Sequence, residues 1–187
     1  MDAHAVSSAL RGLTDALTGV SSVLGAGLAD GELIDVVTAC EVAKRALAAV
    51  QADATAALST SVKAADAVRG RPARDRGCSV APMIAAARGV SPYQGGRHVG
   101  LANALVQEMP NTLAALRAGR IEEWTATGIV AATAFLGPPG RARVDLALVK
   151  EVTRHGVPGS RIVGSARALA QQADPAAAVA RAHQAES

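Results

Sequence analysis

Aromatic side chains are scarce in this sequence. Half of its 187 residues are hydrophobic, yet it contains one tyrosine, one tryptophan and one phenylalanine, at Tyr93, Trp124 and Phe135. Alanine, leucine and valine must therefore fill the interior, and alanine is the residue that most favours helices. No stretch alternates apolar and polar residues as a strand would. We predict an all-α fold, a multi-helix bundle with Trp124 and Phe135 in its core.

Catalytic and metal-binding patterns are missing as well. Two cysteines are too few for a disulfide framework or a zinc cage, and the four histidines lie far apart, none at metal-ligand spacing. The sequence contains no nucleophile elbow, phosphate loop or dinucleotide fingerprint. It therefore predicts a chain with no catalytic residue, no metal and no cofactor. The cysteines and histidines are Cys40, Cys78, His4, His98, His155 and His183.

Long apolar runs are absent too. No segment approaches the roughly 18 to 20 consecutive apolar residues that a membrane-spanning helix needs, and the N-terminus has no basic region typical of an export signal. We expect no membrane partner and a cytoplasmic location.

The first 68 residues carry two helical patterns. Apolar residues recur every three or four positions over about residues 5–24, and a second stretch, residues 32–68, continues this period without glycine or proline. We predict an N-terminal helical hairpin over residues 1–68, whose second helix is on the order of 50 Å long. A period sustained over this length fits either an antiparallel bundle or pairing with a second copy of the chain. The first stripe consists of Val6, Leu10, Leu13, Leu17, Val20 and Leu24.

Positive charge is concentrated immediately after the hairpin. Residues 67–100 contain six arginines and one acidic residue, Asp75, whereas residues 1–66 contain eight acidic and four basic residues. Glycine, proline and charge over residues 69–78 predict an exposed, mobile linker. Two interpretations stay open, a solvated loop and a set of phosphate contacts for nucleic acid. The linker arginines are Arg69, Arg71, Arg74 and Arg76.

Residues 79–187 predict a compact helical region that folds as one unit with the hairpin. Within it, residues 82–106 have the pattern of a helix-turn-helix corner. Ala85 permits a close crossing, Gly89 allows the turn, and Ser91 caps the second helix. Two interpretations stay open for this corner, contact with double-stranded DNA and a packing arrangement that also occurs in helical proteins that do not bind DNA. The side chains expected on the exposed face of the second helix are Tyr93, Gln94, Arg97 and His98.

A further helix is expected to begin near Ile121, where Glu122 and Glu123 favourably complement the positive end of the helix dipole. This position is a sufficient structural reason for both carboxylates. We therefore assign them no binding role from the sequence.

Four segments occur in the order typical of one family, residues 85–92, 101–105, 109–110 and 113–121. From about residue 30 onward the chain resembles the actinobacterial domain of unknown function 222, the helical region in front of an HNH endonuclease domain in a mycobacterial repeat family. The resemblance implies a non-catalytic accessory domain that positions the nuclease on DNA, with the His-Asn-His module following the equivalent of Ser187. The alternative, from a different class, is an assembly module that forms a dimer or binds a protein partner through the N-terminal helices.

Overall fold

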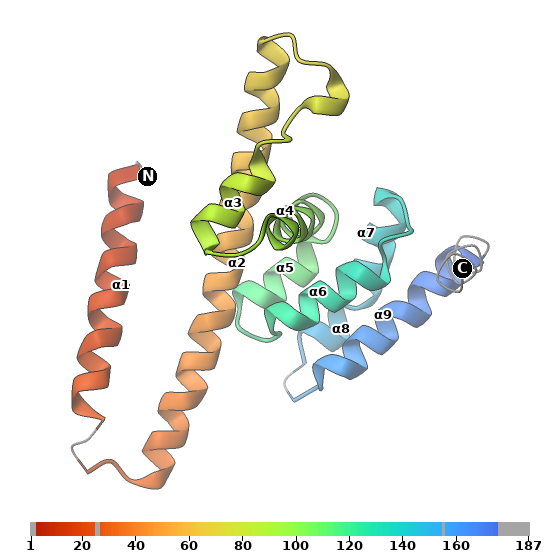
Figure 1. The fold of residues 1–187 in the computed structure, drawn as a ribbon. Helices are drawn as coiled ribbons and strands as arrows, with labels where there is room; N and C mark the ends of the chain where they lie inside the picture. The colour runs from red at the N-terminus through yellow and green to blue at the C-terminus, as the bar shows by residue number, and fades with distance from the viewer. Residues whose placement is uncertain (1–2, 25–26, 155, 176–187) are drawn as a thin grey trace. The chain divides into compact units, whose positions relative to one another are not determined.

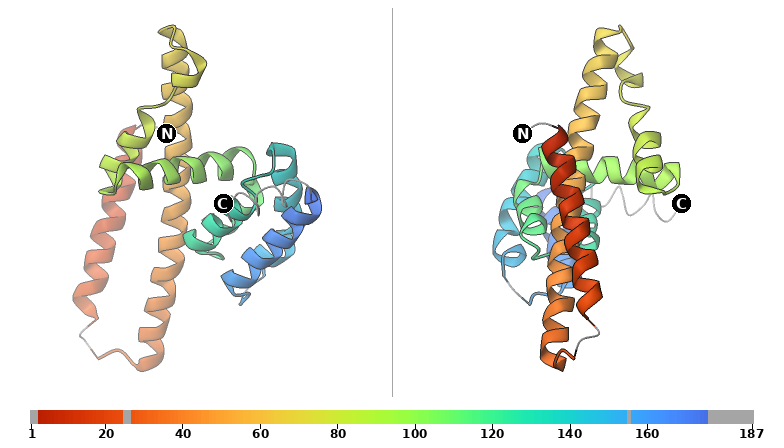
Figure 2. Two further views of the ribbon diagram at one scale, coloured as in Figure 1. Left: turned by 45° about the vertical axis from the view of Figure 1, so that its right-hand side comes forward. Right: turned by 90° about the vertical axis from the view of Figure 1, so that its left-hand side faces the viewer.

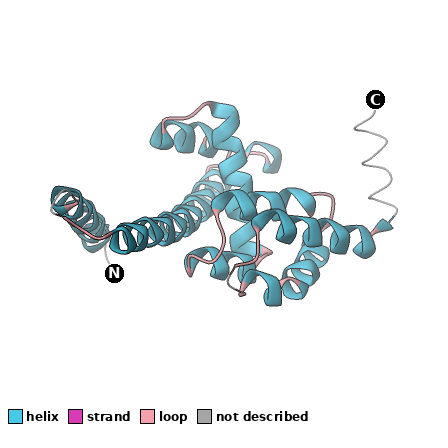
Figure 3. Ribbon diagram, turned by 90° about the horizontal axis from the view of Figure 1, so that it is seen from below, coloured by secondary structure: helices cyan, strands magenta, loops and turns pink. Residues whose placement is uncertain are grey.

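A computed structural model describes residues 3–24, 27–154 and 156–175 of the chain. Every regular element in these ranges is helical, and none is a strand (Figures 1 and 3). The predicted all-α fold is confirmed. The elements are α1 (Ala3–Val23), α2 (Asp30–Val68), the 3₁₀ helix η1 (Ala73–Asp75), α3 (Val80–Arg88), α4 (Pro92–Gln107), α5 (Pro110–Arg117), α6 (Glu123–Ala132), α7 (Pro138–Ala147), α8 (Val149–Val152) and α9 (Gly159–Ala173).

The chain forms two compact units, residues 1–41 and 42–187, and the boundary lies inside α2. The first unit contains α1 and the start of α2. Along α1 the predicted apolar stripe is present, and its six side chains are 36–45 % exposed. None of them is buried. Within the described residues, no helix of either unit combines the length and the apolar character needed to cross a bilayer.

The long second helix is continuous over its 39 residues, which corresponds to about 58 Å at a rise of about 1.5 Å per residue. The helix is continuous because most of this range contains neither glycine nor proline, the residues that would interrupt its backbone hydrogen bonds. In the second unit, small side chains of α2 form one side of the core, which Leu101, Leu105 and Leu116 fill from the other. These small residues are Ala48, Ala49, Ala52 and Ala56.

The predicted helix-turn-helix-like corner is formed by α3 and α4 (Figure 2). Gly89 ends α3 in the left-handed conformation, with φ of 64°. Ser91 then begins α4 with a capping box, since its hydroxyl accepts from the Gln94 backbone N–H and the Gln94 side chain accepts from the Ser91 backbone N–H. Gly95 is buried where the helices cross, and a Cβ there would lie 2.8 Å from the Cβ of Ala85. Glycine at this position permits the close approach.

A buried aspartate connects α7 to the start of α5. Asp145 is 1 % exposed, and its carboxylate accepts from the backbone N–H groups of Asn111 and Thr112 at 2.8 and 2.9 Å. It also accepts from the Asn111 amide at 2.9 Å and the Thr112 hydroxyl at 2.6 Å. Met109, at the N-cap position of α5, offers no side-chain cap. Asp145 therefore supplies from a distant helix the acceptors that the first turn of α5 needs.

Candidate nucleic-acid interface

The predicted linker, residues 69–78, is a folded loop that closes around one buried carboxylate. Asp66, near the end of α2, accepts from the Gly77 backbone N–H at 3.0 Å. It also forms ion pairs with Arg71 at 3.5 Å and with Arg69 at 3.8 Å. The sequence indicated a mobile connection, but these contacts hold the loop at both of its ends. These contacts could not be predicted from the sequence, because Asp66 lies within a stretch that has the periodicity of a helix and no feature marks it as a buried carboxylate.

The four arginines of this loop, which we call the basic loop, nevertheless remain at the surface. Arg74 has 87 % of its side chain accessible and forms an ion pair with Asp75 at 3.8 Å. Arg76 donates from Nε to the backbone carbonyl of Arg71 at 2.9 Å. Residues 69–78 carry four arginines and Asp75, a net charge of +3, and Asp66 at the end of α2 reduces the charge of residues 66–78 to +2.

Only some of the α4 side chains that were predicted to lie exposed and to contact DNA are free to do so. Tyr93 is 77 % exposed, and Arg97 is exposed and makes no ion pair with any described residue. The side chain of Gln94, in contrast, is engaged in the capping box with Ser91. His98 is half-buried, so the expectation that it lies on the exposed face is wrong.

His98 belongs to a cluster that joins three helices. The carboxylate of Glu123, on α6, lies 3.2 Å from the Arg88 guanidinium on α3 and 3.5 Å from Nδ1 of His98 on α4. Burial lowers the pKa of His98, Arg88 and Arg97 lower it further, and Glu123 acts in the opposite direction. Glu123 therefore does more than complement a helix dipole. Sequence reasoning missed this role because both partners lie at least 25 residues away in the chain.

A groove of about 530 Å³ runs between α4 and α6. Trp124, in the first turn of α6, lines it and is 62 % exposed. The prediction that Trp124 lies in the core is therefore wrong, whereas Phe135 packs against the core as expected. The prediction failed because the small number of aromatic residues does not determine which face of a helix the tryptophan occupies. The other lining residues include Gln94, Arg97, His98, Leu101, Thr127 and Ala131.

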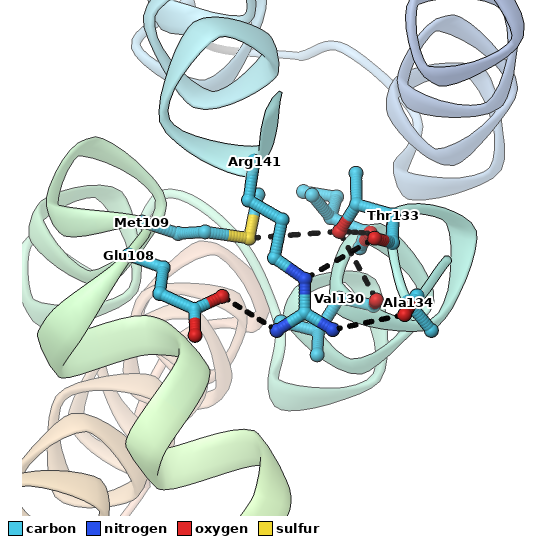
Figure 4. Close-up of polar contacts among 7 residues, drawn as sticks. Glu108, Met109, Val130, Thr133, Ala134 and Arg141 are labelled. Carbon is cyan, nitrogen blue, oxygen red and sulfur yellow. Dashed lines mark hydrogen bonds and ion pairs between the residues drawn. The ribbon is translucent and has the colours of Figure 1, made fainter. Parts of the chain in front are cut away.

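Arg141, from α7, also lines this groove, and Figure 4 shows its polar contacts. Its guanidinium pairs with Glu108 at 2.7 Å and donates to the backbone carbonyls of Thr133 and Ala134. Figure 4 also shows the Thr133 hydroxyl beside the sulfur of Met109, at 3.8 Å. The contacts of the guanidinium fix the orientation of Arg141. Its positive charge is balanced by the carboxylate of Glu108.

No group of three or more histidine, cysteine, aspartate or glutamate side chains suited to a metal ion occurs among the described residues. His155 and His183 lie outside those residues. The candidate binding side chains of the second unit lie on separate elements, the four arginines on the basic loop, Tyr93 and Arg97 on α4, and Trp124 on α6.

The fold and this surface define an all-helical domain with a helix-turn-helix-like corner. The chain belongs to the family described as domain of unknown function (DUF222), whose sequence model matches residues 34–187. The predicted membership in domain of unknown function 222 is thereby confirmed. Comparison with curated proteins finds no match, and comparison with solved structures finds none either.

Proposed function

We propose that this domain binds double-stranded DNA without catalysing a reaction, and that it positions an HNH-type endonuclease there as an accessory domain. The observation that carries the proposal is the basic loop, in which four arginine side chains are presented on ten residues at the surface. Arginine side chains that contact phosphate oxygens supply affinity that does not depend on base sequence.

The contacts of Asp66 strengthen this proposal. A loop held at both ends loses little conformational freedom on binding, so less of the interaction energy is consumed in ordering it. Tyr93, 77 % exposed at the start of α4, adds a further donor to phosphate or sugar groups. Because Asp66 and Asp75 offset part of the charge, we expect weak, non-specific affinity, with Kd of about 10⁻⁶ to 10⁻⁴ M at physiological salt.

The test is a fluorescence-anisotropy titration of the chain into a labelled random duplex, at salt concentrations of about 50 and 200 mM. The variant Arg74→Ala/Arg76→Ala removes two exposed guanidinium groups and leaves both ion pairs of Asp66 in place. We expect it to reduce the slope of log affinity against log salt by about 1.8, since each phosphate contact contributes about 0.9.

The matched control is Arg143→Ala/Arg167→Ala, which removes the same charge from exposed positions on α7 and α9. We expect this control to bind like the unmodified chain. Absence of binding at the lower salt concentration would refute the proposal. So would an equal loss of affinity in the two double variants, because the effect would then come from net charge alone.

Self-association is a second candidate function, favoured by the exposed stripe on α1. Its members are spaced four, three, four, three and four residues apart, which is the heptad pattern of helices that pair along a seam. Light scattering at tens of micromolar should then detect a dimer, which Leu10→Lys/Leu17→Lys converts to a monomer. Ser8→Lys/Ser22→Lys places the same charges on the opposite face of α1 and should leave the dimer intact. A monomeric unmodified chain would exclude this candidate.

A further inference from the structure

We propose that the groove between α4 and α6 binds a short unpaired segment of a nucleic-acid strand, with a base stacked on Trp124 and a neighbouring phosphate on Arg97. This inference rests on the proposed nucleic-acid binding and adds a second site, distinct from the basic loop and specific for single strands.

The walls of the groove are two helical stripes that face each other. Most lining residues of α4, at positions 94, 97, 98 and 101, and of α6, at positions 124, 127 and 131, have the spacing of one helix face. Gly100, Val130 and Glu123 also line the groove, and the Glu123 carboxylate is paired with Arg88 and His98. Gly100 has no side chain, and the lining side chains of Thr127 and Ala131 are short, which leaves space between the two helices. The α4 stripe is about 10 Å long, which matches about three stacked nucleotides at about 3.4 Å each.

Trp124 is the first reason to place a base in this groove. A tryptophan buries more apolar area than any other side chain when it is covered, yet this one is 62 % exposed. An indole ring at the edge of a groove is a stacking platform for any base, because every base has a flat π face. Stacking on such a ring requires that the base be free of its duplex partner.

Arg97 is the second reason, because it lines the groove as a cation that forms no ion pair with any residue in the part of the chain that the structure describes. Arg141 is paired with Glu108, and the neighbouring Arg88 is paired with Glu123. Arg97 makes no ion pair with any described residue, and it lines the same groove as Trp124. A cation beside an aromatic platform is the combination that single-stranded nucleic acid requires.

The size of the groove favours one strand over two. A volume of about 530 Å³ is that of a small-molecule pocket, whereas the paired bases of an intact duplex are stacked inside the helix and cannot enter such a pocket. Half-buried His98 and the apolar floor at Leu101 would contact the edge and face of an inserted base. An apolar or proline-rich peptide is the competing occupant, and it lacks the phosphate that Arg97 would bind.

Trp124 is the one tryptophan of the chain, so its fluorescence reports on this groove alone. We expect a short oligodeoxythymidylate to quench the emission saturably, and a blunt duplex of equal length to quench it much less. Anisotropy of a labelled oligodeoxythymidylate should show about tenfold or greater weakening for Trp124→Ala and near-normal binding for Trp124→Phe, which keeps an aromatic face. Arg97→Gln should reduce the salt slope by about 0.7.

The control is Leu146→Ala, which shortens an exposed apolar side chain of α7 outside the groove, and circular dichroism melting establishes that each variant is folded. Unchanged oligonucleotide binding by Trp124→Ala overturns the inference, as does saturable quenching by a proline-rich peptide in place of the oligonucleotide. The two proposals fail separately. Arg74→Ala/Arg76→Ala should weaken duplex binding while the quenching by single strands persists.

Discussion

Replacing Asp145 with alanine should cost a large part of the stability of the second unit. The substitution removes the carboxylate that accepts four hydrogen bonds from Asn111 and Thr112. Thr112 is fully buried, so water cannot replace the acceptor for its backbone N–H or its hydroxyl. Asn111 is partly exposed, so its two donors can be partly rehydrated.

The magnitude follows from the number of donors left without an acceptor. Each buried polar group that loses its partner costs about 1–3 kcal/mol, and Thr112 contributes two such groups. The burial of the carboxylate itself is unfavourable, and removing it offsets part of this loss. We therefore expect a decrease of about 3–4 kcal/mol in the free energy of unfolding, against a total of about 5–15 kcal/mol for a typical domain. Asp145→Asn keeps one acceptor oxygen and should fall between alanine and the unmodified chain.

Urea denaturation followed by far-ultraviolet circular dichroism measures this difference. The matched control is Asp53→Ala, which breaks an exposed ion pair with Arg117 of 2.7 Å and should cost about 0–1 kcal/mol. A loss below about 1 kcal/mol for Asp145→Ala, equal to that of the control, would show that the carboxylate does not hold α5 as described.

Two further predictions concern the α3–α4 corner and its neighbours. Gly95→Ala should lower the free energy of unfolding by about 1–3 kcal/mol, because its Cβ would collide with the backbone carbonyl of Ala81. Gly100→Ala, on the same helix with open space around it, should instead stabilise by about 0.5–1 kcal/mol, and equal melting temperatures for both would contradict this. The pKa of His98 is lowered from its ordinary value of 6.5, so the unfolded chain binds this proton more readily. Stability from this group is complete above pH 6.5 and declines as pH falls towards the lowered pKa. Thermal melts across this range should show a steeper decline for the unmodified chain than for His98→Gln, and parallel profiles would refute the assignment.

Local features of the fold could be predicted from the sequence. The continuity of α2 follows from the absence of helix breakers over residues 32–68. The corner follows from Ala85, Gly89 and Ser91, because turn and cap chemistry act within a few residues. The same locality explains why the exposed positions Tyr93 and Arg97 were identified correctly.

Features that depend on distant partners could not be predicted. Glu123 meets Arg88 and His98 only after three helices have packed, and its sequence neighbours suggest a simpler role. The same holds for Trp124, whose exposure depends on how α6 turns its faces relative to α4. A local contact was also not predicted, since the side chain of Gln94 closes the capping box with Ser91.

The capping of α5 by Asp145 has a consequence for how the second unit folds. The acceptor lies 33 and 34 residues after the donors, so the first turn of α5 cannot be completed until α7 has been synthesised and has docked. A nascent or truncated chain that ends before Asp145 would leave α5 frayed at its start, since its N-cap position offers no substitute. The two helices therefore acquire their stability together, and this non-local step links the middle of the unit to its C-terminal half in a single cooperative event.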